Sequence, residues 1–222
     1  MGLDRIRSFY DSRARTYGQT DEEGTRRYNA AISLAEFGPQ NVVLDIGCKF
    51  GLLHDLLAQG RVSHEYFGID LVVSATVDSG NSSRQLVQAN VSDGIPFKSC
   101  HFTHVFCLEL LEHIPSPLLL LDEISRVLKP GGQLILSVPN PFYWAEVYGN
   151  LRGMPDTEGH ISSFSPQNMR RLLEFASFEE RARCGTYIYL PFLHYFVDMR
   201  RWPFARSVVY LAAKDSGAPL LP

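Results

Sequence analysis

Long apolar runs are absent from this chain of 222 residues. No stretch approaches the roughly 18 consecutive apolar residues that a transmembrane helix needs, and the N-terminal segment MGLDRIRSFYDSRARTYG is too polar for a signal peptide. The start MGLDRI also fails as a myristoylation signal, because Ile6 stands where Ser or Thr is required. We therefore expect a cytoplasmic protein with no transmembrane segment.

Runs of basic residues are absent as well, and the formal net charge is -3. Nucleic-acid-binding proteins usually gather Lys and Arg on one surface, so we expect no nucleic-acid partner. Internal repeats and low-complexity tracts are also missing. With 45% hydrophobic residues and this length, the chain is expected to fold as a single domain over residues 1–222.

Cysteines are few, and their spacing is uninformative. Cys48, Cys100, Cys107 and Cys184 form no C-x-x-C pair, and three of them stand beside apolar, strand-like runs. Zinc sites and disulfide frameworks usually show closer or more regular spacings. The four residues are therefore expected to be reduced thiols of the core.

Short apolar runs that alternate with helical patterns are what the sequence does contain. This alternation is typical of an α/β fold, in which helices cover both faces of a mostly parallel sheet. Ser116 with Pro117, and Ser165 with Pro166, are expected to open helices, because Ser is a common cap and Pro suits the first turn. The predicted strands are 42–46, 66–69, 86–88, 104–108 and 134–138.

The segment 140–164 differs from the rest, because it is rich in aromatics but lacks sustained periodicity. Long loops in compact domains are usually functional or disordered, and the aromatics argue against disorder. We therefore predict an ordered excursion on the substrate side of the sheet.

The stretch VVLDIGCKFGLL reads as a buried strand, a glycine turn and a helix start. Gly47 and Gly51 give the turn its permissive backbone, and Asp70 closes the next strand, where a carboxylate can bind the hydroxyls of a ribose. A dinucleotide fingerprint would need glycine at positions 49 and 52, which hold Lys49 and Leu52. The strand, the turn and Asp70 together favour a cofactor loop over an ordinary strand-to-helix connection, and the missing glycines argue against a dinucleotide.

Six segments resemble, in order, the motifs of class I S-adenosylmethionine-dependent methyltransferases. They are VVLDIGCKFG, YFGIDL, NVSDGIPF, FCLELLEHIPSP, EISRVLKPGGQLILSVPN and GHISSFSPQNMRRLLEFASF. The similarity extends over about residues 40–180, and it points to the group with ubiquinone-biosynthesis and other small-molecule or glycan-pathway enzymes. It implies a Rossmann-like, mostly parallel seven-stranded sheet and S-adenosyl-L-methionine as cofactor.

The resemblance also implies roles for particular residues. Asp45 and Gly47 would hold the methionine end of the cofactor, Asp70 the ribose, and Leu71 the adenine. Asn90 stands where the family usually has Asp near the adenine amino group, although Asn also suits a polar turn. The complete predicted cofactor set is Asp45, Gly47, Cys48, Gly51, Asp70, Leu71, Asn90, Val91, Glu109 and Tyr17.

Two histidines are the candidate catalytic residues. His113 follows Glu109 and Glu112 at helical spacing, and similar residues bind a divalent cation in ubiquinone-pathway O-methyltransferases. The alternative, which we favour, is a metal-free site in which Glu112 and His113 brace the helix start. His160 is expected to take a proton from the acceptor or to anchor its loop.

The segments near the two ends of the chain are candidates for covering the cofactor or contacting the acceptor. Residues 1–36 resemble a helical lid that includes Tyr17, and ordinary packing is the alternative. The aromatic stretch 187–204 is expected to pack under the last strands, to cover an apolar acceptor, to touch a membrane surface or to form a homodimer face. The sequence thus predicts a methyltransferase for a small-molecule, lipid-like or glycan-pathway acceptor; the alternative is a cofactor-binding but inactive partner protein.

Overall fold

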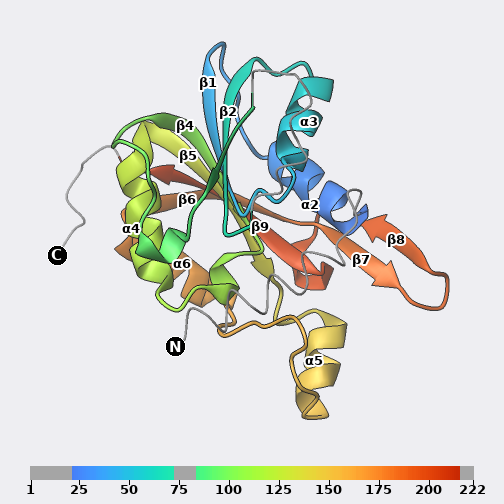
Figure 1. The fold of residues 1–222 in the computed structure, drawn as a ribbon. Coiled ribbons are helices and arrows are strands. Elements are labelled where there is room, and N and C mark those ends of the chain that lie inside the picture. Colours follow the sequence, from blue (N-terminus) through green and yellow to red (C-terminus); the bar gives the residue numbers. More distant parts are fainter. Residues whose placement is uncertain (1–21, 73–83, 216–222) are drawn as a thin grey trace.

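A seven-stranded sheet forms the centre of the computed structural model, which describes residues 22–72 and 84–215 (Figure 1). Its strand order is β3-β2-β1-β4-β5-β9-β6, with β1 to β5 parallel and β9 antiparallel to both of its neighbours. The strands are β1 (Asn41–Ile46), β2 (His64–Asp70), β3 (Arg84–Gln88), β4 (Phe102–Leu108), β5 (Leu128–Pro139), β6 (Phe178–Gly185) and β9 (Ser207–Lys214). Each of the five predicted strands lies within one of these, so the predicted α/β, Rossmann-like sheet is confirmed.

Helices cover both faces of the sheet (Figure 1). On one face α2 (Glu22–Ile32) and α3 (Leu52–Gln59) close one part of the hydrophobic core, and on the other face α4 (Pro117–Val127) and α6 (Pro166–Phe175) close the larger part. The central strands therefore face apolar side chains on both sides, which explains their continuous apolar sequences.

The two predicted helix starts behave differently. Ser165 caps α6, because its hydroxyl accepts a hydrogen bond from the Asn168 amide at 3.3 Å. Ser116 occupies the corresponding position before α4, but its side chain makes no capping hydrogen bond. The helix begins at Pro117 as predicted, so the start is correct and the capping role of Ser116 is wrong.

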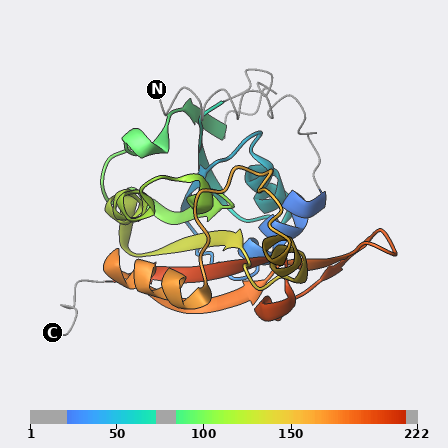
Figure 2. The same ribbon diagram turned by 90° about the horizontal axis from the view of Figure 1, so that it is seen from below.

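The carboxyl ends of β1, β2, β4 and β5 meet at one edge of the sheet. Helix α5 (Trp144–Leu151) and the segment after it lie across this edge, as the view from below shows (Figure 2). The sequence predicted an excursion over 140–164 but missed this helix. This helix has no buried residue and exposes Trp144, Val147, Tyr148 and Leu151. Its sequence therefore shows no apolar face directed toward a core, which is the pattern that would have predicted a helix.

A two-stranded hairpin, β7 (Tyr187–Leu190) and β8 (Tyr195–Asp198), projects from the body (Figure 1). Tyr187 is buried, but Phe192 at the tip is 99% exposed and Leu193 is 72% exposed. The expectation that this aromatic stretch packs under the last strands is therefore wrong for the tip, because the chain turns away from the sheet between β6 and β9.

All four cysteines are free thiols, as predicted. Cys48, Cys107 and Cys184 are buried, whereas Cys100 is exposed and is not a core residue. In the part of the chain that the structure describes, no helix has the length and apolar character to cross a bilayer.

Candidate functional site

The loop between β1 and α3 carries three left-handed residues in alternation. Gly47, Lys49 and Gly51 have φ values of 80°, 49° and 78°. The Gly47 amide donates to the Ile69 carbonyl at 2.8 Å, which ties the loop to the end of β2. Gly51 directly precedes α3, as the sequence predicted, and the Lys49 side chain is exposed. The loop thus turns on two glycines and tolerates a lysine between them.

Asp70 closes β2 beside this loop. Its carboxylate accepts hydrogen bonds from the Lys49 amide at 2.8 Å and from the Val72 amide at 3.1 Å, one on each oxygen. Burial raises the pKa of Asp70, while these two amides lower it. Each carboxylate oxygen can accept a further hydrogen bond, so the group can still bind two ribose hydroxyls. Leu71 follows, half-buried, where an adenine would lie against it under the predicted role.

Asp45 is fully buried beneath the loop. Its carboxylate accepts a hydrogen bond from the Tyr66 hydroxyl at 2.8 Å and weaker ones from the Tyr28 hydroxyl at 3.4 Å. Burial raises the pKa of Asp45 to about 7, and the two tyrosines oppose this shift only in part. The sequence did not single out Tyr28 or Tyr66 for this role, because only the packing of α2 and β2 on β1 brings them to the carboxylate.

Glu109 follows β4 in a left-handed conformation, with φ 50°. Its two oxygens accept hydrogen bonds from the Ser137 hydroxyl at 2.8 Å and the Ser207 hydroxyl at 3.1 Å. The Arg27 Nε lies 3.9 Å from the first of these oxygens. Helix α2 and strands β5 and β9 therefore hold the carboxylate in place.

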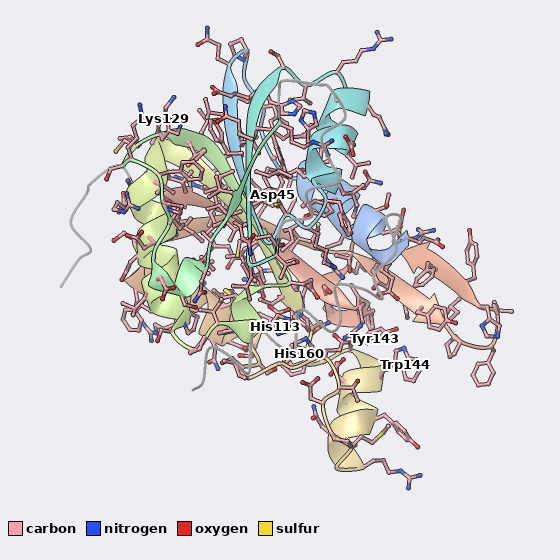
Figure 3. All side chains as sticks on the ribbon, in the orientation of Figure 1. Asp45, His113, Lys129, Tyr143, Trp144 and His160 are labelled. Carbon is pink, nitrogen blue, oxygen red and sulfur yellow. The ribbon has the colours of Figure 1, made fainter. Side chains whose placement is uncertain are left out.

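Glu112 and His113 lie in the short helix η3 (Leu111–His113), and His160 comes from the segment after α5. The rings of His113 and His160 are 4.9 Å apart, and Figure 3 shows the two side by side at the lower end of the sheet. The Glu112 side chain is buried, and neither of its oxygens has a hydrogen-bond partner among the described residues. The structure thus brings together two histidines that the sequence predicted separately.

His113 and His160 differ in their partners. The His113 Nδ1 lies 3.1 Å from the Gly159 carbonyl oxygen, and burial lowers the pKa of this imidazole. In His160, Nδ1 lies 3.3 Å from an Asp156 oxygen and Nε2 lies 3.3 Å from a Glu158 oxygen. The His113 Nε2 lies 4.0 Å from a Glu112 oxygen, whereas His160 has a carboxylate oxygen at 3.3 Å from each nitrogen.

The family of methyltransferase domains matches residues 20–181 of this chain. The chain belongs to this family. It is a class I S-adenosylmethionine-dependent methyltransferase, and S-adenosyl-L-methionine is its cofactor. The parallel sheet with one antiparallel strand and the glycine loop above Asp45 agree with this family.

Curated relatives of this methyltransferase include ubiquinone biosynthesis O-methyltransferases. The protein of Xylella fastidiosa is 35% identical over 105 residues, which are 44% of this chain and 42% of that protein. The protein of Xanthomonas campestris is 40% identical over 105 residues, with 44% and 43% covered. The match thus spans less than half the length of these relatives.

Solved structures show the same fold at low sequence identity. A Haloferax volcanii methyltransferase, solved in complex with the Trm112 methyltransferase activator, superimposes with a TM-score of 0.77 and 16% identity, covering 97% of this chain and 100% of that one. The Burkholderia thailandensis 1,6-didemethyltoxoflavin-N1-methyltransferase, solved with S-adenosylhomocysteine, gives a TM-score of 0.64 and 17% identity, covering 96% and 86%.

Other predicted cofactor residues of the methyltransferase have structural partners. The Asn90 side chain accepts a hydrogen bond from the Ser92 amide at 3.1 Å, so it serves the turn, while its adenine role stays a prediction. Cys48 is buried, and its sulfur packs so closely against Gly68 that a Cβ on Gly68 would lie 2.6 Å from it. The Cys48 side chain is therefore used in packing, and only its backbone is left to contact a cofactor. Half-buried Val91 opens helix η2 (Val91–Asp93), and Tyr17 lies outside the described residues.

The site contains side chains of types that bind metal ions, but their ligand atoms are not positioned to bind one ion together. The ligand atoms of Glu112, His113 and His160 lie within 4.8 Å of one another. An ion bound at about 2.0 to 2.2 Å from each ligand would require closer spacing, and His160 would have to release a carboxylate. Glu109, the third ligand of the resemblance, is bound by two serines. Our expectation of a metal-free site remains a prediction.

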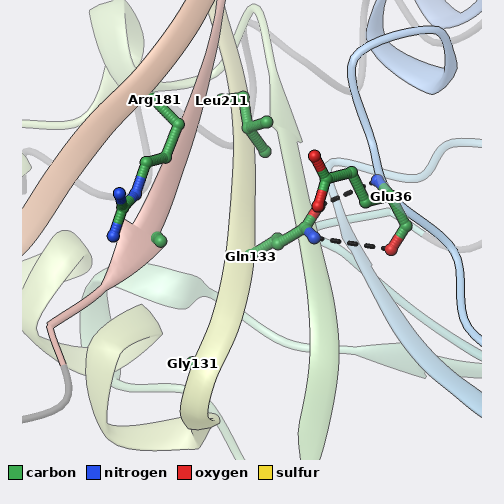
Figure 4. A pocket seen from close by; sticks show the side chains of 6 residues that line it. Glu36, Gly131, Gln133, Arg181 and Leu211 are labelled. Atoms are coloured by element: carbon green, nitrogen blue, oxygen red, sulfur yellow. Dashed lines mark hydrogen bonds between the residues drawn. The ribbon is translucent and has the colours of Figure 1, made fainter.

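A cavity of about 310 Å³ lies at the opposite edge of the sheet, at the amino end of β5. Glu36, Gly131, Gln133 and Arg181 contribute to its lining, and Figure 4 shows Gln133 bound to the backbone of Glu36. Within the described part of the chain, none of the predicted site residues lines it. They lie at the other edge, where the strands end, so this cavity does not belong to the predicted site.

Proposed function

We propose that this chain methylates a small-molecule acceptor and that His113 accepts the proton released by the acceptor. The observation that carries the second part is the hydrogen bond between His113 Nδ1 and the Gly159 carbonyl, at 3.1 Å. A carbonyl can only accept, so Nδ1 carries the hydrogen and the lone pair is on Nε2. Because burial lowers the pKa of His113, the imidazole is neutral near pH 7 and able to take a proton.

His160 is better suited to anchoring. A neutral imidazole has one donor and one acceptor nitrogen, whereas both nitrogens of His160 face carboxylate oxygens. Glu158 in turn pairs with Arg206 at 3.0 Å, and Arg206 also pairs with Glu146 of α5. This chain of contacts ties the segment 140–164 to the residue before β9, which supports a role for His160 in holding the substrate-side excursion.

Bound S-adenosylmethionine supplies an electrophilic methyl group on a sulfonium. The acceptor atom would form a bond to the methyl carbon as the carbon–sulfur bond breaks with its electron pair on sulfur, and His113 Nε2 would take the acceptor proton. Positioning alone can supply about 7 to 11 kcal/mol of such a barrier. We assign the methionine end of the cofactor to Asp45 and Gly47, and its ribose to Asp70.

The departures from the family pattern are compatible with an active enzyme. Lys49 keeps the left-handed backbone of the turn and is exposed. Thr103 stands where the family commonly has Asp, and its hydroxyl bonds both the amide and the carbonyl of Val42, which is a structural role. Asn90 caps a turn and retains an amide group for adenine. These observations favour catalysis over the alternative of an inactive partner protein.

The test is turnover of S-adenosylmethionine with a panel of phenols, amines and sugars, followed by mass spectrometry of the products. His113→Gln should lower kcat by about 10²- to 10⁴-fold, the usual contribution of a general base, and leave the affinity for S-adenosylhomocysteine unchanged. His160→Gln is the matched variant and should mainly raise the KM of the acceptor. Normal kcat in His113→Gln would refute the assignment of the base.

A further inference from the structure

We infer that Arg84 is a positioning residue that holds the cofactor loop in its binding conformation. Arg84 begins the edge strand β3 and lies 35 positions beyond Lys49 in the sequence. The inference rests on the assignment of the loop between β1 and α3 to S-adenosylmethionine, and it concerns a residue outside the motifs of the family resemblance.

The loop needs such a holder because of Lys49. Its φ of 49° lies in the left-handed region, which is unfavourable for a residue with a Cβ because the Cβ comes close to the following carbonyl oxygen. Gly47 and Gly51, at 80° and 78°, bear little of this cost. A strained residue keeps its conformation only when its surroundings impose it.

Arg84 supplies this restraint at the residue after Lys49. Its Nη1 donates a hydrogen bond to the Phe50 carbonyl at 2.9 Å, and its Nη2 forms an ion pair with Asp55 in the first turn of α3. The side chain is only 13% exposed. One guanidinium therefore links the edge strand, the loop and the helix that begins at the loop.

The guanidinium also lies against the bare backbone of Gly51. A Cβ at this position would come within 3.2 Å of Arg84 Nη1 and 3.4 Å of its Cζ. Two residues before Gly51, the Lys49 amide donates a hydrogen bond to the Asp70 carboxylate at 2.8 Å. Two side chains, Asp70 and Arg84, thus fix consecutive residues of the loop through its backbone.

This arrangement has a consequence for binding. Asp70 is expected to meet the ribose, so it acts on the cofactor directly, whereas Arg84 acts through the loop. Without Arg84, the left-handed conformation at Lys49 competes with relaxed ones, and part of the binding free energy goes into restoring it. Cofactor affinity then falls although no group assigned to cofactor contact is removed.

The experiment measures S-adenosylhomocysteine binding by calorimetry and thermal unfolding of the same samples. Arg84→Met should weaken binding about 5- to 20-fold, and Asp55→Asn, which retains the side-chain shape, should weaken it to a smaller extent. In a Lys49→Gly background the Arg84→Met loss should shrink, because the turn is no longer strained. Arg183→Met removes an Arg–Glu pair from the other edge strand, β6, and is the matched control.

A lower melting temperature with unchanged affinity in both Arg84→Met and Asp55→Asn would overturn the inference, because it would leave Arg84 a stabilising role alone. An equal loss of affinity in Arg183→Met would overturn it too. If the unaltered protein bound no S-adenosylhomocysteine, the cofactor assignment itself would fail, and the role of Arg84 with it. Binding of S-adenosylhomocysteine by the unaltered protein therefore distinguishes a failure of the role of Arg84 from a failure of the cofactor assignment.

Discussion

Asp45→Asn should make the protein more stable and at the same time poorer at binding its cofactor. The carboxyl group is fully buried, and burial raises its pKa to about 7 from the usual 3.8. Asn has nearly the same shape and can still accept a hydrogen bond from Tyr66 or Tyr28. The substitution therefore removes the charge while it leaves the packing in place.

The magnitude follows from the two pKa values. The folded protein holds this proton more tightly than the unfolded chain, so the Asp45 contribution is complete below about pH 4 and is lost as the pH rises to about 7. At roughly 1.36 kcal/mol per pKa unit, the full loss is about 4 kcal/mol, of which about 2 to 3 kcal/mol falls between pH 5 and pH 8. In Asp45→Asn this loss is absent.

Cofactor binding should respond to pH in the opposite direction. The ionised carboxylate can pair with the ammonium of the methionine moiety, and the protonated group cannot. Since the pKa of Asp45 is about 7 in the free protein, S-adenosylhomocysteine should bind the unaltered protein about tenfold more weakly at pH 6 than at pH 8. Asp45→Asn should bind weakly at both values.

Urea unfolding and calorimetry at pH 5, 6, 7 and 8 measure both effects. Asp122→Asn, which alters an exposed aspartate of α4, is the control for loss of a carboxyl group elsewhere. If the difference in unfolding free energy between Asp45→Asn and the unaltered protein stays constant from pH 5 to pH 8, the buried charge is not the cause. Equal affinities for S-adenosylhomocysteine would refute the role of Asp45 in binding.

Two further substitutions test the nucleoside end of the site. Asp70→Ala should weaken S-adenosylhomocysteine binding by roughly 1 to 3 kcal/mol, the cost of lost charged hydrogen bonds; an unchanged dissociation constant in calorimetry would refute the ribose role. Asn90→Asp keeps an oxygen for the Ser92 amide and adds the carboxylate usual in the family. It should tighten adenosine competition by about 0.5 to 1.5 kcal/mol, and no change would leave Asn90 with turn capping alone.

Local patterns predicted the elements whose sequence shows how they are buried. The continuous apolar run before Asp45 indicated a strand covered on both faces, and Ser165 with Pro166 indicated the start of α6. Helix α5 was not predicted, because it exposes Trp144 and Leu151 and has no apolar face directed toward a core. The hairpin tip at Phe192 escaped for the related reason that aromatics there were assumed to be buried.

The sequence by itself identified the candidate site residues. They are the glycines of the turn, the carboxylates that end or follow strands, and the histidines of the fourth and last motifs. Their positions relative to the strands are local properties, and in a parallel sheet the strand ends meet at one edge. The sequence therefore determined the family and the cofactor, and it predicted the edge of the sheet for the site.

Only the tertiary structure decided which partners these residues have. Tyr66 reaches Asp45 through strand pairing, Arg84 reaches Phe50 from an edge strand, and Glu158 lies beside His160. Such contacts join distant parts of the chain, and no local propensity encodes them. Because they set the pKa values and the hydrogen-bond partners of these side chains, they also decide which chemistry the side chains can perform.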